Sequence, residues 1–320
     1  MRADAVFEGG GVKAIGLLGA LSVAEARGYE WGNLAGTSAG AIVAALLAAG
    51  YRADEISSML MNQDLTRFRD QCLLGRIPVA GPILSVLLWY GIHPGTYFEE
   101  WMREKLLARG VRTFGDLIFD EFSTDNRYRF RLRVIASDLS NRRLLVLPDD
   151  VEYYGVKPEA LDVAWAVRMS MSIPFFYHSV RLHYRLAGGR PAVSHIVDGG
   201  LLSNFPVWLF DSPGPPPWPT FGFLLVEPNF HRYRELINPL SFAAALFSTM
   251  MEAHDTRYME EEDRVRTIAI PTLGIKSTDF NLSRADKERL FDSGVKAAEE
   301  FFSSWDFQEY VHLYRRGPAE

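Results

Sequence analysis

The chain has 320 residues, of which 48% are hydrophobic and 23% charged, a balance that is typical of a globular protein with a large core. Its formal net charge of −6 argues against nucleic acid as a partner, because nucleic-acid-binding proteins carry basic surfaces. The single cysteine, Cys72, excludes a disulfide within the chain and a multi-cysteine metal site. The N-terminal sequence MRADAVFEGGG lacks the apolar segment of a secretion signal, so we expect a cytoplasmic protein.

The first fifty residues predict two strand–turn–helix units. An apolar run at Ala5 to Phe7 predicts a strand, and Lys13 to Arg27 predict a helix. A second turn around Ser38 leads into an apolar helix that ends at Ala49, with Gly50 as its C-cap. This alternation is typical of an α/β fold with a parallel sheet.

The glycine run EGGGVK, Glu8 to Lys13, joins the first strand to the first helix. It matches neither of the common phosphate-loop patterns in its usual context. A turn at a helix start can also aim consecutive backbone N–H groups at an anion, and an acyl-transfer enzyme needs such an oxyanion hole. We favour the oxyanion hole, while a plain tight turn and a phosphate site remain open alternatives.

The sequence GTSAG, Gly36 to Gly40, fits G-x-S-x-G, in which a sharp strand-to-helix turn exposes a serine. Small residues are needed on both sides because strand and helix approach closely, and Gly36 and Gly40 meet this need. The dipole of the following helix favours negative charge at its start. We interpret Ser38 as a nucleophile, although a plain helix N-cap serine has the same short pattern.

The stretch IPVAGPILSVLLWYGIHP, Ile77 to Pro94, is unusually apolar and carries no formal charge. Its prolines and glycines argue against a continuous membrane-spanning helix. The favoured structural interpretation is a buried helix at Ile83 to Tyr90. The alternative is a lid or apolar insertion at residues 64–96, with Leu87, Leu88 and Trp89 lining a route for lipid. No basic cluster accompanies the stretch, so such docking would depend on apolar insertion more than on attraction to anionic lipid.

The rest of the chain continues the alternation of strands and helices within one domain that covers residues 1–320. A proline-dense stretch, Asp211 to Thr220, predicts a stiff surface loop. The acidic run Glu260 to Asp263 is interpreted as a solvated helix end, and the carboxylates show no metal-ligand spacing. Strands are predicted at Arg129 to Ser137, Arg143 to Pro148, Phe221 to Val226 and Val265 to Ile270, and helices at Gly95 to Leu107, Glu159 to Arg168, Asn238 to Asp263 and Ser283 to Phe302.

A serine nucleophile needs a nearby base. None of the seven histidines lies in a glycine-flanked loop near the C-terminus, where a Ser–Asp–His order would place it. In VDGGLLSNFP, by contrast, Asp198 directly follows an apolar strand end and precedes Gly199 and Gly200. Burial there would raise the basicity of the carboxylate, but an Asp-Gly turn is commonly structural.

Taken together, these stretches resemble the patatin-like phospholipases. The family pattern has a glycine-rich turn with a basic residue, a G-x-S-x-G elbow and a D-G-[GA] base, in this order. The segment SMSIPFF, Ser170 to Phe176, also resembles the small-residue and proline segment between elbow and base. The matching positions are Gly9, Gly10, Gly11 and Lys13 in the first motif, Ser38 in the second, and Asp198, Gly199 and Gly200 in the third.

The resemblance implies a patatin-type three-layer α/β/α fold with a mostly parallel central sheet and a Ser–Asp dyad without histidine. It implies hydrolysis of a lipid ester through a covalent acyl-enzyme, with no cofactor and no metal. Ser38 would attack, Asp198 would take its proton, and backbone N–H groups of the glycine turn and of Ala39 would hold the oxyanion. Lys13 would steady the turn. The expected partners are a lipid ester substrate and, transiently, a membrane or micelle surface.

Three other interpretations stay open on the sequence alone. The first is an α/β-hydrolase-type esterase with a Ser–His–Asp triad, which single histidine substitutions would identify. The second is a catalytically silent lipid-binding or scaffold protein on the same fold. The third is transfer of the acyl group to an acceptor other than water. The sequence does not specify the head group, the ester position, an activator or the oligomeric state.

Overall fold

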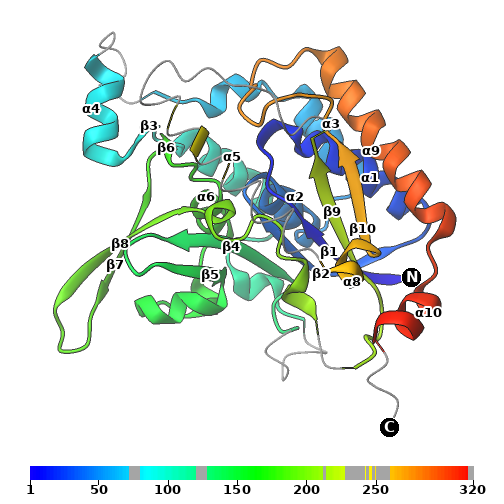
Figure 1. Ribbon diagram of the computed structural model, residues 1–320. Coiled ribbons are helices and arrows are strands. Elements are labelled where there is room, and N and C mark those ends of the chain that lie inside the picture. Colours follow the sequence, from blue (N-terminus) through cyan, green and yellow to red (C-terminus); the bar gives the residue numbers. More distant parts are fainter. Residues whose placement is uncertain are drawn as a thin grey trace.

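The computed structural model describes residues 1–71, 80–119, 128–211, 214–227, 242, 245–246, 249 and 260–315. It contains a central, mostly parallel sheet flanked by helices, which confirms the predicted α/β class (Figure 1). The helices are α1 Ala14–Ala26, α2 Ala39–Ala48, α3 Ala53–Asn62, α4 Ala80–Trp89, α5 Thr96–Leu107, α6 Val163–Ser170, α8 Glu261–Arg264, α9 Arg284–Ser304 and α10 Phe307–Tyr310.

The main sheet has eight strands, seven of them in the order β10–β9–β1–β2–β4–β8–β7, with β5 also paired to β4. The five strands from β10 to β4 run parallel, whereas β5, β7 and β8 add antiparallel pairs. A separate parallel pair joins β3 to β6. The bounds are β1 Arg2–Phe7, β2 Glu30–Thr37, β3 Gly91–His93, β4 Leu132–Asp138, β5 Arg143–Leu147, β6 Phe175–Tyr177, β7 Val180–Arg185, β8 Pro191–Asp198, β9 Thr220–Val226 and β10 Thr267–Pro271.

Strand β4 brings two distant parts of the chain together. Val134 and Ile135 pair with both β2 and β5, and Ala136 to Asp138 pair with both β5 and β8. Because a strand has only two edges, β5 must occupy one edge of β4, while β2 and β8 share the other. β2 runs parallel and β8 antiparallel to β4, so their last residues, Thr37 and Asp198, approach each other end to end. The residue after β2 is Ser38.

Glycines allow the closest helix contact of the fold, between α1 and α9. A Cβ on Gly19 would lie 2.0 Å from the carbonyl oxygen of Phe291, and one on Gly294 would lie 1.9 Å from that of Gly16. The two helices therefore meet backbone to backbone, and any side chain at these positions would force them apart. Figure 1 shows α1 and α9 beside β9 and β10.

The two faces of the sheet bury different residues. In β1, Ala5 and Phe7 belong to the main core that the helices cover, while Val6 points to the opposite face. There it packs with Ala35 of β2 and with residues of the segment after β8, including the 3-10 helix Val207–Phe210. Burial of β1 on both faces explains the unbroken apolar run from Ala5 to Phe7 at its end.

Most predicted elements are observed with shifts of a few residues at their ends. The predicted helix at Glu159 to Arg168 begins later, as α6, because a 3-10 turn at Pro158–Ala160 precedes it. The predicted helix at Asn238 to Asp263 lies mostly outside the described residues, as do His231 and His254. The helix α3 and the strands β3, β6 and β7 were not predicted.

The apolar stretch does form a helix, α4, but the prediction that this helix is buried is wrong. Only Gly81 and Ser85 of α4 are buried, and several of its leucines face the outside. Figure 1 shows this helix at one end of the molecule. Among the described residues, no helix is both long and apolar enough to span a bilayer.

Candidate active site

The serine turn after β2 has the geometry that its glycines predict. Ser38 has φ +51° and ψ −121°, a conformation that non-glycine residues rarely adopt. A Cβ on Gly36 would lie 2.4 Å from the backbone carbon of Gly40, and one on Gly40 would lie 2.3 Å from the carbonyl oxygen of Phe7. Both positions therefore require glycine, and the close packing holds Ser38 in its strained conformation at the start of α2.

A second serine, Ser170, secures this turn from the end of α6. The N–H of Ser38 donates to Ser170 Oγ at 2.8 Å, and Ser170 Oγ donates to the carbonyl oxygen of Ile135 at 2.5 Å. The hydroxyl therefore bridges the point on β4 where β2 and β8 meet end to end. Because both backbone groups are buried, they would otherwise remain unpaired at a cost of about 1–3 kcal/mol each. The sequence placed Ser170 in a small-residue segment but indicated no role for it.

Asp198 ends β8 and is completely buried. Its Oδ1 accepts the N–H of Gly200 at 2.8 Å, and its own N–H donates to the carbonyl oxygen of Ser172. Burial raises the pKa of the carboxyl from 3.8 to about 7, even though hydrogen bonding from the Ser38 hydroxyl and the Gly200 N–H lowers it. Oδ2 has no partner with full hydrogen-bond geometry among the described residues, so it is the oxygen available to a proton from Ser38.

Gly199 shows why glycine follows the aspartate. A Cβ on Gly199 would lie 2.3 Å from the carbonyl oxygen of Ile135, so the turn after β8 packs directly against β4. Gly200 contributes its N–H to Asp198 instead. In the D-G-G motif, Gly199 thus lets the backbone pack against β4, and Gly200 holds the Asp198 carboxyl in place. The motif lies next to the serine turn.

The glycine run lies on the other side of Ser38. A Cβ on Gly9 would lie 3.1 Å from Cβ of Ser38, which places the two turns in contact. Gly10 is extended at φ −170°, and Gly11 is left-handed at φ +57°, as it begins the 3-10 helix Gly11–Lys13. The N–H of Gly9 donates to the carbonyl oxygen of Asn204 at 3.2 Å, so Gly9 does not fit the predicted role of oxyanion donor. No hydrogen bond between described residues uses the N–H of Gly10 or Gly11. Ala39, the first residue of α2, likewise has no partner within its helix for its N–H.

The buried pair Glu8 and Asn204 supports this turn. Asn204 Nδ2 donates to Glu8 Oε1 at 2.9 Å and to the carbonyl oxygen of Gly9 at 3.2 Å, and the N–H of Leu225 donates to Glu8 Oε2. Asn204 therefore links the segment after Asp198 to the glycine run. This role of Glu8 was not predicted, because its partners Asn204 and Leu225 are far away in the chain.

Lys13 points away from the serine. Its side chain is mostly buried, and its Nζ lies 3.4 Å from Oε1 of Glu227, just after β9. It does not line the pocket at Ser38. This position ties the end of the glycine run to the sheet, which is consistent with the expected supporting role.

An apolar pocket opens beside Ser38. It encloses about 620 Å³, part of it open to solvent. Ser38 and Ala39 contribute from the serine turn, and Gly11 from the glycine run. Among the described residues the rest of the lining is apolar apart from one tyrosine hydroxyl, from Val12, Ala14, Ile15, Ile42, Leu60, Leu65, Phe68, Phe98, Met171, Ile173, Tyr177 and Phe280. Such a lining suits an acyl chain.

Leu87, Leu88 and Trp89 are not among the lining residues of this pocket. Leu87 and Leu88 lie on the exposed side of α4, while the ring of Trp89 stacks on His178 with 5.2 Å between ring centroids. Contact between these three residues and lipid therefore stays a prediction, and the structure places them on the surface and not in the wall of the pocket.

The described histidines have partners other than Ser38 and Asp198. A ring nitrogen of His93 is paired with the carbonyl oxygen of Asp70, His178 with Ser85 Oγ, and His195 with Ser179 Oγ. His183 and His312 are exposed. Among the described residues, the groups that lower the pKa of the Asp198 carboxyl are the Ser38 hydroxyl and the Gly200 N–H, and no histidine is one of them.

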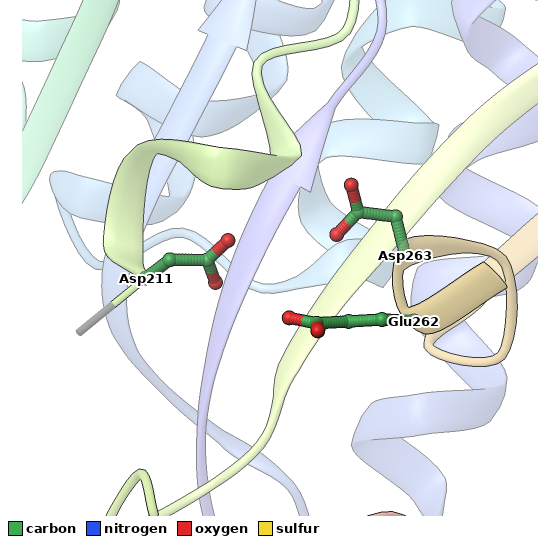
Figure 2. A group of neighbouring side chains, drawn as sticks. All are labelled: Asp211, Glu262 and Asp263. Carbon is green, nitrogen blue, oxygen red and sulfur yellow. The ribbon is translucent and has the colours of Figure 1, made fainter. Parts of the chain in front are cut away.

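Three carboxylates gather far from this site, at Asp211, Glu262 and Asp263 (Figure 2). Two arginines bind them: Arg266 contacts Asp211 at 2.7 Å and also Asp263, and Arg315 contacts Glu262 at 2.9 Å and also Asp211. The guanidinium groups occupy the oxygens that a cation would need, so we interpret the group as an ion-pair cluster. The expectation that Glu260 to Asp263 form a solvated helix end is wrong for Glu262 and Asp263.

Comparison with known proteins agrees with this geometry. The sequence model of the patatin-like phospholipases matches residues 5–211. The uncharacterized protein YqhO of Bacillus subtilis is 37% identical over 314 residues, which cover 96% of this chain and all of that protein. Protein R571 of Acanthamoeba polyphaga mimivirus is 25% identical over 305 residues, which cover 92% of this chain and 91% of that protein.

Solved structures of low sequence identity share the fold. VipD from Legionella pneumophila is 17% identical with a TM-score of 0.55, over 94% of this chain and 67% of that chain. ExoU in the ExoU–SpcU complex of Pseudomonas aeruginosa is 17% identical with a TM-score of 0.51, over 98% of this chain and 52% of that chain. The match of the family model over most of the chain carries the assignment: the chain belongs to the patatin-like phospholipase family, which supports a lipid hydrolase as its activity.

Proposed function

We propose that this protein hydrolyses carboxylic esters of lipids, as a phospholipase A or lysophospholipase, with Ser38 and Asp198 as a catalytic dyad. Asp198 Oδ2 takes the hydroxyl proton while Ser38 Oγ attacks the ester carbonyl, forming a tetrahedral oxyanion. Collapse of this intermediate expels the alcohol, which leaves with the proton from Asp198, and an acyl-Ser38 ester remains. Water, deprotonated by Asp198, then attacks the acyl-enzyme, and the Ser38–acyl bond breaks as Asp198 returns the proton to Ser38 Oγ, which releases the fatty acid and restores the enzyme.

The oxyanion is assigned to the N–H groups of Gly10, Gly11 and Ala39. Support for this comes from their position at two helix starts on either side of Ser38, where the described structure gives them no other partner. Backbone donors held in place by packing need no rearrangement when charge develops, which is why they stabilise a transition state more than the ground state.

The observation that carries the proposal is the meeting of Ser38 with a buried, basic carboxylate at the wall of an apolar pocket. Ser38 lies in that wall, and Asp198 has its pKa raised to about 7 by burial. A carboxylate with an ordinary pKa would be too weak a base for a serine hydroxyl near neutral pH. The apolar lining beyond Ser38 suits the acyl chain and gives little support to a polar substrate.

A serine-directed fluorophosphonate tests the nucleophile, and a substrate panel tests the class. We expect the adduct on Ser38 alone, and release of fatty acid from at least one of phospholipids, lysophospholipids, galactolipids or acylglycerols. The Ser38→Ala variant is the control for both. Labelling of a different serine, or fatty acid release that survives in Ser38→Ala, would contradict the proposal. Product analysis with added alcohol shows whether water is the acceptor.

The raised pKa of Asp198 predicts the pH dependence of the reaction. The carboxyl acts as a base only when ionised, so kcat/KM on a soluble ester should rise with pH, with a midpoint near 7, and level off above about pH 8. A rate that stays constant from pH 5 to pH 8 would exclude Asp198 as the base.

The same carboxyl should also affect folding stability, but here the effect of rising pH is unfavourable. The folded-state pKa of Asp198 is raised above 3.8, so its stabilising contribution is present below that pH and is lost as the pH rises through about 7. Asp198→Asn should therefore melt at a higher temperature than the wild type at pH 8, and this gap should shrink at pH 5. A difference in melting temperature between Asp198→Asn and the wild type that is the same at pH 5 and pH 8 would contradict the raised pKa.

A further inference from the structure

An exposed apolar ridge runs along α4. We define it as Ile83, Leu84, Leu87 and Leu88, which are 55%, 41%, 70% and 48% exposed. Their spacing places them on one face of the helix, opposite the buried Ser85. The sequence from Ile77 to Phe98 contains no Asp, Glu, Lys or Arg, so this surface is both apolar and uncharged. A monomeric protein rarely exposes such a contiguous patch without a partner.

Two aromatic residues extend the ridge at the cost of backbone strain. Tyr90 and Phe175 have φ of +62° and +66°, in the left-handed region that bulky residues avoid. They are neighbours, because the N–H of Phe175 donates to the carbonyl oxygen of Tyr90, and both side chains are exposed. Because both side chains are exposed, this backbone strain is not offset by packing in the core. Residues with strained backbone conformations are common at functional sites.

A basic hairpin borders the ridge. From His178 to Val197 the sequence contains three arginines and no acidic residue, in a chain whose net charge is −6, and the one acidic residue of β7 and β8, Asp198, is buried at the end of β8. Arg181, His183 and Arg185 alternate along β7 and are exposed on the same face. The expectation that no basic cluster accompanies the apolar stretch is therefore wrong, because this cluster is distant in sequence but adjacent in space.

Direct contacts join the ridge and the hairpin into one surface. Arg181 donates to the carbonyl oxygen of Leu88 at 3.1 Å, and the ring of His195, opposite Arg181 on β8, packs edge-on against Tyr90. Figure 1 shows α4 and the hairpin β7–β8 on the same flank of the molecule. The face of β7 that carries the arginines is thus the face that meets α4.

The same surface leads to the apolar pocket. Phe175 is followed by Phe176, whose ring stacks on Phe280 with 5.5 Å between centroids, and then by Tyr177. Phe280 and Tyr177 both line the pocket that contains Ser38. The exposed aromatic pair is therefore separated from the lining of the pocket by a single residue along β6.

We propose that the α4 ridge, Tyr90, Phe175 and the arginines of the hairpin form a docking surface for a bilayer that contains anionic phospholipid. The ridge and the aromatic rings enter the interfacial region, and Arg181, Arg185 and Arg190 contact phosphate and carboxylate groups of the lipids. Charge complementarity selects this partner, since the exposed residues of the hairpin include arginines and no acidic residue. The inference rests on the proposed function, because it supplies that site with substrate from the bilayer.

Vesicle binding by the full chain tests the docking surface without catalysis. In the Ser38→Ala background, we expect co-sedimentation with vesicles that contain about 30% phosphatidylserine, and weaker binding to pure phosphatidylcholine or at high salt. Leu87→Asn/Leu88→Asn and Arg185→Glu/Arg190→Glu should each weaken binding about tenfold or more. The controls are Leu107→Asn, an exposed leucine of α5, and Arg284→Glu/Arg289→Glu, which changes the net charge equally on α9. Neither control should alter binding.

Activity with wild-type Ser38 separates this proposal from the proposed function. The ridge and hairpin variants should hydrolyse a short soluble ester at the wild-type rate and lose about tenfold on vesicles. Equal vesicle binding by the ridge variants and their control would overturn the docking surface, as would a change of oligomeric state on gel filtration without a change in vesicle binding. A protein that binds vesicles as expected but hydrolyses no ester would contradict the proposed function alone.

Discussion

Ser38→Ala and Asp198→Asn are each expected to lower kcat on a soluble ester on the order of 10⁴-fold, while the protein remains folded. Removal of Ser38 leaves no atom to carry the acyl group, and removal of the Asp198 charge leaves no acceptor for the hydroxyl proton. Because the two residues act as one unit, the double variant should be little worse than either single one. Steady-state kinetics and circular dichroism on all three variants check this.

Two matched variants show whether such losses belong to the site. Asp4→Asn neutralises another buried carboxyl whose pKa burial raises, to about 6, on β1 outside the site. Ser194→Ala removes a buried hydroxyl from β8 itself, where it accepts from Asn141. Both should leave kcat within about twofold, since effects at separate sites are independent. Full activity in Asp198→Asn would remove the carboxylate from the mechanism.

The glycine run and the serine turn could be predicted because their residues are constrained locally, whereas Asp198 as the base followed from the resemblance to the family. Gly36 and Gly40 are needed wherever a strand turns this sharply into a packed helix, and the structure shows the backbone contacts that exclude a side chain. The order of strands and helices followed from apolar runs in the same way. Such constraints act over a few residues, so a single sequence is enough to read them.

Contacts between distant segments could not be predicted in this way. Ser170 binds the Ser38 N–H across 132 residues, and Glu8 meets Asn204 across 196. Serine and asparagine are common in loops, so their residue type gave no signal. The exposed position of α4 was missed for a related reason: an apolar helix has the same pattern whether protein or lipid covers it.

A substitution in the glycine run is expected to cause the second large loss of activity. Gly11→Ala is expected to lower kcat about 10²–10³-fold with little change in KM, which is the loss typical of an oxyanion donor. Gly11 has φ +57°, and a Cβ there would lie 2.0 Å from the carbonyl oxygen of Ser277, which itself accepts the N–H of Val12. The turn must therefore move, and its N–H groups with it. Gly10→Ala should be milder, because its extended backbone tolerates a side chain and the clash is with the end of Leu225.

Gly155→Ala separates the loss of oxyanion donors from backbone strain. Gly155 is also left-handed, at φ +76°, but no atom lies within 4 Å of its added Cβ, and it lies outside the site. This variant should lose about 1 kcal/mol of stability and keep its kcat. Kinetics on a soluble ester well below both melting temperatures, with active sites counted by fluorophosphonate, removes the contribution of unfolded protein. If Gly11→Ala then raises KM and leaves kcat per site unchanged, the turn binds substrate in its ground state, and the oxyanion must be held elsewhere.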